Sequence, residues 1–317
     1  MLVSGFYRTS GMYKVKLILF CITITFLIGC FLAISSLPSE ECTCKREALS
    51  YTQTEDSRHK LGIVVPFRER FEELLEFAPH IHDFLNKQSI NHKIYIINQV
   101  DQYRFNRASL INVGFNIAVS EGCDYIAMHD VDLLPLNPGL SYSYPSVGLF
   151  HVASPELHPR YHYPTFVGGI LLVKREDFEA VNGMSNKYWG WGLEDDEFYV
   201  RLKEAGINVS RPLNITTGIE NTFRHMHDRV VRKRDMAKCF NQREVTRRRD
   251  RQTGLRDVAY SVQGRRTVVV DHAPVTVVNV ALRCNRTITP WCLCSEEKKA
   301  STSNLAKTKT SKKEPAR

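Results

Sequence analysis

Predicted strands and helices alternate in the stretch that follows residue 60, and this alternation limits the possible folds more than any other feature. Leu61 to Pro66 is a β-branched run closed by proline, and residues 71–85 then carry apolar side chains at helical spacing. A second strand is predicted at 92–99, an apolar helix at 107–121 and a third strand at 124–129. The order predicts an α/β domain with a mostly parallel sheet and flanking helices.

The third predicted strand ends in two carboxylates, Asp130 and Asp132, with Val131 between them. Ligands of open α/β sheets bind beyond the carboxyl ends of the strands. Carboxylate oxygens there suit Mg²⁺ or Mn²⁺ holding a diphosphate. The alternative is a polar turn closed by Pro135.

The middle of the chain combines irregular sequence with one further strand signal. Residues 133–164 are rich in Pro, Tyr, Ser and His, which predicts loops over the site. A strand is predicted at 166–173, where Gly168 and Gly169 indicate a backbone that a ligand or neighbour approaches closely. Later elements are predicted at three places, a helix at 176–181 and strands at 267–270 and 275–282.

A second notable stretch pairs aromatic with acidic residues. Trp189 and Trp191 are separated by one glycine, and four acidic residues at 194–197 then open a predicted helix that ends at Gly206. Aromatic faces stack on sugar rings and carboxylates bind sugar hydroxyl groups, so this composition predicts a carbohydrate site. The alternative is that the acids only complement the helix macrodipole.

Two histidines and a basic segment follow. His225 and His227 lie on one face if their segment is extended, and with Asp228 they form a candidate metal shell. Two surface histidines are the alternative, and for such a pair taken alone they are the usual interpretation. Residues 229–256 are strongly basic and indicate either a solvated helix or a loop that attracts a diphosphate or an anionic chain. The net charge of +9, from 43 Lys and Arg against 34 Asp and Glu, fits nucleic acid, a sulfated polysaccharide or a phosphate-rich ligand.

An apolar run from Leu17 to Leu37 contains no charged residue and is long enough to cross a bilayer. Basic residues precede it and Glu40 and Glu41 follow, which predicts a cytosolic amino terminus and a lumenal remainder. A cleaved signal peptide is the alternative. The predicted parts are a cytoplasmic tail at 1–16, an anchor at 17–37, a stem at 38–60, a lumenal domain at 61–295 and a disordered basic tail at 296–317.

Four cysteines near the end of the chain could form two disulfides in an oxidising compartment. A Cys292–Cys294 bridge would strain a very small ring, which leaves Cys239–Cys294 with Cys284–Cys292, or Cys239–Cys292 with Cys284–Cys294. We favour the first pairing because Cys284 to Cys292 can close a hairpin-sized loop; a zinc site is the alternative. Sequons at Asn208, Asn214 and Asn285 are compatible with a secretory route.

Six motifs in order resemble the β-1,4-galactosyltransferase family between residues 61 and 294. They are Val64 to Arg68, Phe105 to Arg107, Asp130 to Asp132, Val167 to Gly169, Trp189 to Gly192 and Glu194 to Asp196. The segments His225-Met-His227-Asp228 and Tyr161-His-Tyr163 resemble most the branch that adds galactose to xylose on proteoglycan core proteins. Relatives that act on N-acetylglucosamine typically carry Met and His as metal ligands, and glycine in place of Leu193.

The resemblance implies a GT-A-like fold and a single-pass type II Golgi membrane protein. It also implies Mn²⁺ as cofactor, UDP-galactose and xylosylated core proteins as partners, and no role for nucleic acid. Carried over by motif, Asp195 would be the catalytic base, and Asp132, His225 and His227 would ligate Mn²⁺. The UDP-galactose site would comprise Phe67, Arg68, Arg70, Phe105, Arg107, Asp130, Val131 and Asp132, and the acceptor site Tyr161, Tyr163, Trp191, Leu193, Glu194 and Asp196.

The chemistry of an inverting transfer agrees with this set of residues. It needs a Lewis acid on the departing diphosphate and one carboxylate that takes the acceptor proton. The competing class is a lumenal lectin or glycosaminoglycan receptor, using Trp189, Trp191 and residues 229–256 without turnover. Metal-dependent UDP binding would select the enzyme. A hydrolase built on Glu194 and Asp195 is disfavoured. Glycoside hydrolysis needs two carboxyl groups set apart from each other, and the sequence shows no second carboxylate to pair with these two.

Overall fold

The computed structural model describes residues 8–35, 58–228 and 230–294, and within the first range the side chains of 16–29 only. The chain divides into two compact units, residues 1–52 and 53–317, each of which is considered by itself. The first unit contains one described element, helix α1 (Arg8–Ser35). Within these described ranges, no helix combines the length and the apolarity needed to cross a membrane. The anchor predicted at 17–37 extends past Ser35 and stays a prediction.

The second unit is built on an eight-stranded sheet with the order β7-β5-β6-β3-β1-β2-β10-β9. The four central strands run parallel, whereas β6 and β9 pair antiparallel with β3 and β10. This arrangement confirms a sheet that is mostly parallel at its centre. The strands are β1 (Leu61–Phe67), β2 (His92–Gln99), β3 (Tyr125–His129), β5 (Leu149–His151), β6 (Ile170–Lys174), β7 (Val209–Ser210), β9 (Tyr260–Val270) and β10 (Ala273–Leu282). A separate pair joins β4 (Leu133–Pro135) to β8 (Phe223–His225).

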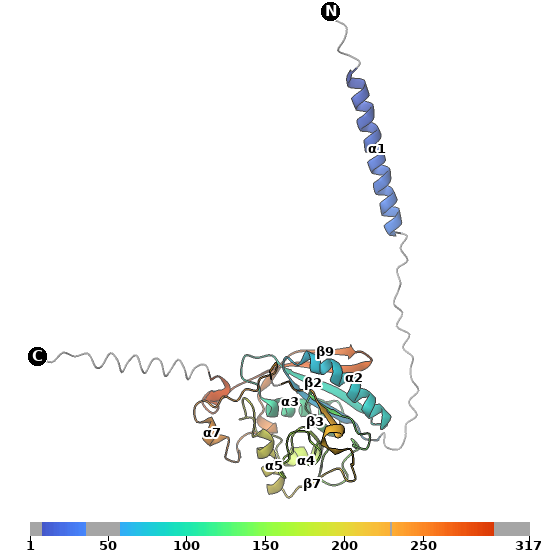
Figure 1. Cartoon of the computed structure of the whole chain (residues 1–317). Coiled ribbons are helices and arrows are strands. Elements are labelled where there is room, and N and C mark those ends of the chain that lie inside the picture. Colours follow the sequence, from blue (N-terminus) through green and yellow to red (C-terminus); the bar gives the residue numbers. More distant parts are fainter. Residues whose placement is uncertain (1–7, 36–57, 229, 295–317) are drawn as a thin grey trace, which may run out of the picture. The chain divides into compact units, whose positions relative to one another are not determined.

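Helices cover both faces of the sheet (Figure 1). Because strand side chains alternate, Ile63 and Val65 pack beneath α2 in one core, and Val64 packs beneath α3 in the other. The helices are α2 (Phe71–Lys87), α3 (Arg107–Ser120), α4 (Arg175–Ala180), α5 (Glu194–Glu204), α6 (Gly218–Thr222) and α7 (Gln242–Val245), with 3-10 turns at Leu255–Asp257 and Pro290–Cys292.

The alternation predicted from the sequence is confirmed through β3, but three later predictions need correction. Strand β6 begins at Ile170 rather than at 166, because Gly169 adopts a left-handed conformation with φ of 75° that ends extended pairing. The stretch 133–164, predicted as loops, contains the short strands β4 and β5. The last strand pair starts earlier than predicted, since β9 already begins at Tyr260.

The structure contains the disulfides Cys239–Cys294 and Cys284–Cys292. This confirms the favoured pairing and excludes the zinc alternative for these thiols. The first bridge joins positions 55 residues apart and the second closes a short loop of separation 8. The first bridge fastens the end of the described chain to the segment that follows the histidine motif, and the second closes a local loop after β10.

Candidate active site

A cavity of about 610 Å³ opens at the carboxyl ends of the central strands. Its volume lies within the range of small-molecule sites. The cavity brings together every predicted site residue except one. The predicted residues in its wall are Arg68, Arg70, Phe105, Arg107, Asp130, Val131, Asp132, Tyr161, Tyr163, Trp191, Leu193, Glu194, Asp195, Asp196, His225 and His227.

Phe67 is the exception. Its side chain is 2% exposed and belongs to the core beneath α2, where its ring meets Phe71 edge-on at 5.4 Å between centroids. Alternation along β1 explains this placement, because Phe67 shares a face with Ile63 and Val65. The structure therefore does not bring Phe67 to the cavity.

The acids at the tip of β3 are held by partners from distant segments. Arg107, the first residue of α3, lies 2.7 Å from an Asp130 oxygen, and the Asp130 amide donates to Gly169 O at 3.0 Å. Burial raises the pKa of Asp130. Burial alone would lower the pKa of Arg107, but the carboxylates of Asp130, Glu194 and Asp195 raise it, which keeps a positive charge between the two acidic groups.

Pairing of β4 with β8 brings the histidines to Asp132. Leu133 is opposite His225, and the Met226 amide donates to Asp132 O at 2.8 Å. One Asp132 oxygen consequently lies 3.3 Å from His227 Nδ1 and 4.0 Å from His225 Nε2. Burial would raise the pKa of Asp132, but the hydrogen bond with His227 and the charge of His225 lower it overall.

Carboxylate and imidazole are donors that suit Mn²⁺. Both imidazole nitrogens lie near the same Asp132 oxygen, and this arrangement fits a site for a divalent ion. As these side chains stand, no three or more His, Cys, Asp or Glu residues in the described ranges form a ready metal cluster. The three donors thus lie close to one another without forming a complete metal shell.

The opposite wall is formed by the start of α5. Leu193 precedes the helix in a left-handed conformation with φ of 77°, and the acids then occupy the first turn. Burial, followed by the charges of Glu194 and Asp196, raises the pKa of Asp195 to about 7. Glu194 Oε2 is buried and has no hydrogen-bond partner within the described residues. This wall therefore presents a carboxyl group, Asp195, whose pKa is about 7, and an acceptor oxygen of Glu194 without a hydrogen-bond partner in the described residues.

Gly168 leaves room for the Asp195 carboxylate. A Cβ atom at position 168 would lie 2.6 Å from Asp195 Oδ2 and 2.6 Å from the Phe166 ring. The close approach that the glycine pair predicted is therefore present, and the neighbour is a candidate catalytic side chain.

The two tryptophans of the motif differ in exposure. Trp191 is 38% exposed and lines the cavity, whereas Trp189 is 3% exposed and packs in the core against Tyr103. Only Trp191 can offer its ring to a sugar. This removes Trp189 from the set that a lectin would use.

Contacts with the segment 235–238 fix the backbone of Trp191. Its amide donates to Asp235 O at 2.9 Å, and Lys238 Nζ donates to Trp191 O at 2.9 Å. Arg104 joins the same segment through Asp235 at 2.6 Å. Gly190 is required beside it, because a Cβ there would meet Arg104 Nη2 at 1.9 Å.

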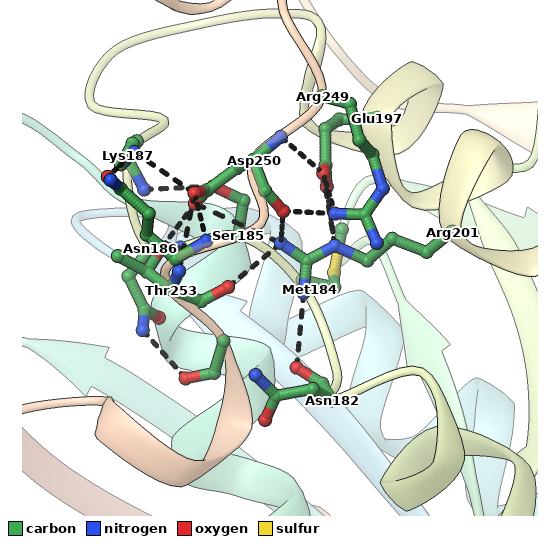
Figure 2. Close-up of polar contacts among 12 residues, drawn as sticks. Asn182, Met184, Ser185, Asn186, Lys187, Glu197, Arg201, Arg249, Asp250 and Thr253 are labelled. Carbon is green, nitrogen blue, oxygen red and sulfur yellow. Dashed lines mark hydrogen bonds and ion pairs between the residues drawn. The ribbon is translucent and has the colours of Figure 1, made fainter. Parts of the chain in front are cut away.

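A buried charge network holds α5 against the segment that follows α7 (Figure 2). Arg201 pairs with Glu197 at 2.8 Å and approaches Asp250 at 3.9 Å, and all three side chains are no more than 3% exposed. Arg249 also pairs with Glu197, at 2.8 Å. Burial would raise the pKa of Asp250, but hydrogen bonds from Ser185, Thr253 and Lys187 hold it at about 2. Much of the basic segment is thus engaged within the protein, and the solvated helix predicted for it is limited to α7.

Sequence reasoning missed several residues of the cavity wall. His158 accepts hydrogen bonds at Nδ1 from the amides of Arg160 and Tyr161, which shapes the turn that carries Tyr161. Arg234 lies over the rings of Trp191 and Tyr161, at 4.5 and 5.7 Å from their centroids. The predicted donor residue Arg68 donates to the carbonyls of Gln99, Asp101 and Tyr103 and so fixes the loop after β2. The sequence alone does not show which arginine fixes a loop and which lies over an aromatic ring.

Two family models match the chain. One is described as the N-terminal region of glycosyl transferase group 7, over residues 37–144, and the other as the N-terminal domain of galactosyltransferase, over residues 148–227.

Curated relatives match over most of the chain. β-1,4-galactosyltransferase 7 of Drosophila melanogaster is 60% identical over 240 residues, which cover 75% of this chain and 74% of that protein. The human β-1,4-galactosyltransferase 7 is 56% identical, covering 75% and 72%. Xylosylprotein 4-β-galactosyltransferase of Caenorhabditis elegans is 51% identical, covering 74% and 83%.

Solved structures agree with these matches. The catalytic domain of the Drosophila enzyme in complex with xylobiose superposes with a TM-score of 0.73 at 59% identity, covering 74% of this chain and 99% of that one. A mutant of the same enzyme, in complex with manganese, UDP-Gal and xylobiose, gives the same values.

Proposed function

This chain belongs to the β-1,4-galactosyltransferase family, and from that premise we propose that it transfers galactose from UDP-galactose to the 4-hydroxyl group of xylose on proteoglycan core proteins. The observation that carries the proposal is a single cavity with two chemically distinct walls. One wall gathers Asp132 with two histidines, and the other presents Asp195. The Drosophila relative, crystallised with manganese, UDP-Gal and xylobiose, supports the same assignment.

Asp132, His225 and His227 would hold Mn²⁺ at the donor end. The bound ion supplies Lewis-acid stabilisation of the departing diphosphate. Arg107 keeps Asp130 in place beside this group, and Arg70 lines the same wall. Arg68 contributes by fixing the loop after β2, whereas Phe67 packs in the core beneath α2.

Asp195 takes the proton of the acceptor hydroxyl. A pKa of about 7 places this carboxyl where it is substantially ionised near neutral pH and still basic enough to accept a proton. One such group suffices, because inversion requires no covalent intermediate. Trp191 offers a ring face to the sugar, and Glu194 Oε2 offers a free acceptor to a sugar hydroxyl. Tyr161, Tyr163, Leu193 and Asp196 complete the acceptor wall.

The same proposal places the protein in the Golgi membrane as a single-pass type II protein with its catalytic domain in the lumen. The uncharged run at 17–37, with basic residues before it, supports an anchor of this orientation. Two disulfides support folding in an oxidising compartment.

An acceptor panel tests the reaction. The protein is incubated with UDP-galactose and Mn²⁺ and offered β-xylosides or N-acetylglucosaminides. Transfer to the xylosides, lost when the metal is chelated, is the expected result. Preferential transfer to N-acetylglucosaminides would contradict the acceptor assignment, and metal-independent sugar binding without transfer would favour the lectin.

A further inference from the structure

Three histidines lie together at the edge of the sheet opposite the cavity. His82 belongs to the second half of α2, His92 is the first residue of β2, and His272 directly precedes β10. Strands β2 and β10 run parallel with Val275 opposite Ile94, so His92 and His272 lie at the same edge. The cavity lies at the carboxyl ends of the strands, and the length of β2 separates the two edges by about 25 Å.

The spacing of the three rings is close to that of metal ligands. His82 Nδ1 lies 2.9 Å from His92 Nε2, with ring centroids 5.0 Å apart. Two imidazoles on one tetrahedral zinc ion have nitrogens about 3.3 Å and centroids about 5 Å apart, given Zn–N bonds of about 2.0–2.1 Å. The His272 ring lies 6.0 Å from that of His82, close to the 5.8 Å between His225 and His227 in the cavity.

Two of the rings also have the outer partners that metal-bound histidines use. His92 Nδ1 donates to Ile90 O at 2.8 Å, and His272 Nδ1 lies 3.2 Å from Asp271 Oδ2. A ligating imidazole almost always donates its other N–H to a backbone carbonyl or a carboxylate, which fixes the ring. Asp83 Oδ1, at 2.7 Å from His272 Nε2, adds a second negative charge beside the rings. The surroundings therefore favour a cation at this place.

We propose that His82, His92 and His272 form a second divalent-metal site, which prefers Zn²⁺ to Mg²⁺ or Ca²⁺. Imidazole nitrogen suits Zn²⁺, whereas the two harder ions prefer oxygen ligands. Within the described residues these donors, like those of the cavity, do not form a complete metal shell as they stand. This site uses no nucleotide sugar, so it stands apart from the proposed function.

Binding requires one proton to move and one ring to turn. Because His92 donates through Nδ1, its Nε2 carries a lone pair, and the proton between the two rings belongs to His82 Nδ1. The ion takes the place of this proton, which passes through solvent to His82 Nε2. His272 turns its Nε2 from Asp83 to the ion and keeps Asp271 at Nδ1, and water completes the shell. The bound ion then joins α2, β2 and the turn between β9 and β10.

Calorimetry on the full chain, freed of metal by chelation, tests the site with Zn²⁺ as the titrated ligand. The cavity donors and cysteines elsewhere in the chain can also bind Zn²⁺, so the readout is the difference between variants. His82→Gln and His92→Gln should each bind one ion fewer per chain than the wild type. His272→Gln should weaken the same site at least by the roughly 10-fold that loss of a ligand's hydrogen-bond partner costs. Mg²⁺ should show no such differences.

His80→Gln is the matched control. His80 lies on the same helix, but its Nε2 contacts a backbone carbonyl, Pro135 O at 2.6 Å, rather than another imidazole. This variant should bind as many ions as the wild type. A second comparison separates the site from the cavity: a chain that carries Asp132→Asn should still lose one ion when His82→Gln is added, because the two sites lie at opposite edges of the sheet.

Thermal unfolding provides an independent readout. Zn²⁺ binds only the folded cluster, so it should raise the midpoint temperature more in the wild type than in His82→Gln. Equal numbers of bound ions in the wild type, His82→Gln and His92→Gln would overturn the inference and leave a hydrogen bond between α2 and β2. Where these two variants do not fold, the exposed His272→Gln decides, and an unchanged affinity for Zn²⁺ would overturn it. Each of these outcomes leaves the proposed transfer intact, since the acceptor panel tests that reaction separately.

Discussion

The donor and acceptor walls of the cavity are built in different ways. The donor wall follows from strands: β1 is hydrogen-bonded on both sides, and Asp130 and Asp132 extend directly from the end of β3. The acceptor wall rests on contacts outside the sheet instead. Helix α5 is held by Arg201, Glu197 and Asp250, and Trp191 by contacts with residues 235–238. Strand pairing thus fixes the proposed metal side, whereas a buried charge network and loop contacts hold the side proposed to bind the sugar.

The largest effect is expected from breaking the buried network. Arg201→Met removes the cation that serves Glu197 and Asp250 and leaves buried carboxylates with fewer partners. We expect a loss of about 3–5 kcal/mol in the free energy of unfolding. Denaturant unfolding measures it. Arg247→Met, at an exposed position, should change stability by no more than about 0.5 kcal/mol. Similar values for the two variants would show that the network does not support α5.

Replacing the central acid of each wall by its amide should impair a different property of the protein. Asp195→Asn should lower turnover about 10²-fold or more, because an amide cannot take the acceptor proton, and should leave binding of UDP and Mn²⁺ in place. Asp132→Asn should weaken metal-dependent UDP binding, because an amide is a poorer ligand for a hard cation. Calorimetry paired with a xyloside transfer assay separates the outcomes. Near-normal transfer by Asp195→Asn would point to Glu194 or Asp196 as the base.

Loss of the aromatic platform should affect the acceptor far more than the donor. Trp191→Ala should raise the xyloside KM about 10-fold, which corresponds to ~1.4 kcal/mol and lies in the range of aromatic contacts. The affinity for UDP should change much less, since the metal group is untouched. Equal damage to both affinities would mean that Trp191 supports the whole cavity rather than the sugar.

The smallest effect concerns pH. Transfer requires ionised Asp195, whose pKa is raised to about 7, so kcat/KM should fall as the pH decreases through that value. Glu194→Gln removes the neighbouring negative charge that raises the pKa of Asp195 most, so this pKa should fall. The acid limb should then move to lower pH by less than about one unit, since burial remains. A pH profile of kcat/KM for the two proteins measures this shift, and movement toward higher pH would contradict the assignment.

The difference between the walls also explains what the sequence could predict. The strands that deliver Asp130 and Asp132 carry their signal locally, in β-branched runs that end at polar residues, and they were confirmed. Ring size excluded a Cys292–Cys294 bridge, and closure of a hairpin-sized loop favoured the pairing that the structure contains. The face of Phe67, the burial of Trp189 and the task of each arginine depend on contacts between residues far apart in the chain. Arg201 and Asp250 are hydrogen-bonded although they lie 49 positions apart, and no periodic pattern in the sequence predicts such a pair.

Gly168 has a consequence for mutational tolerance. It carries no functional group, yet the space above its Cα is occupied by Asp195 Oδ2 and the Phe166 ring. Any side chain at this position must displace a carboxylate that we propose to be catalytic. A survey of inherited or random variants should therefore find position 168 among those intolerant of every replacement, even where the substituted protein folds and is stable. The position is constrained by the close approach of its neighbours and takes no part in the chemistry itself.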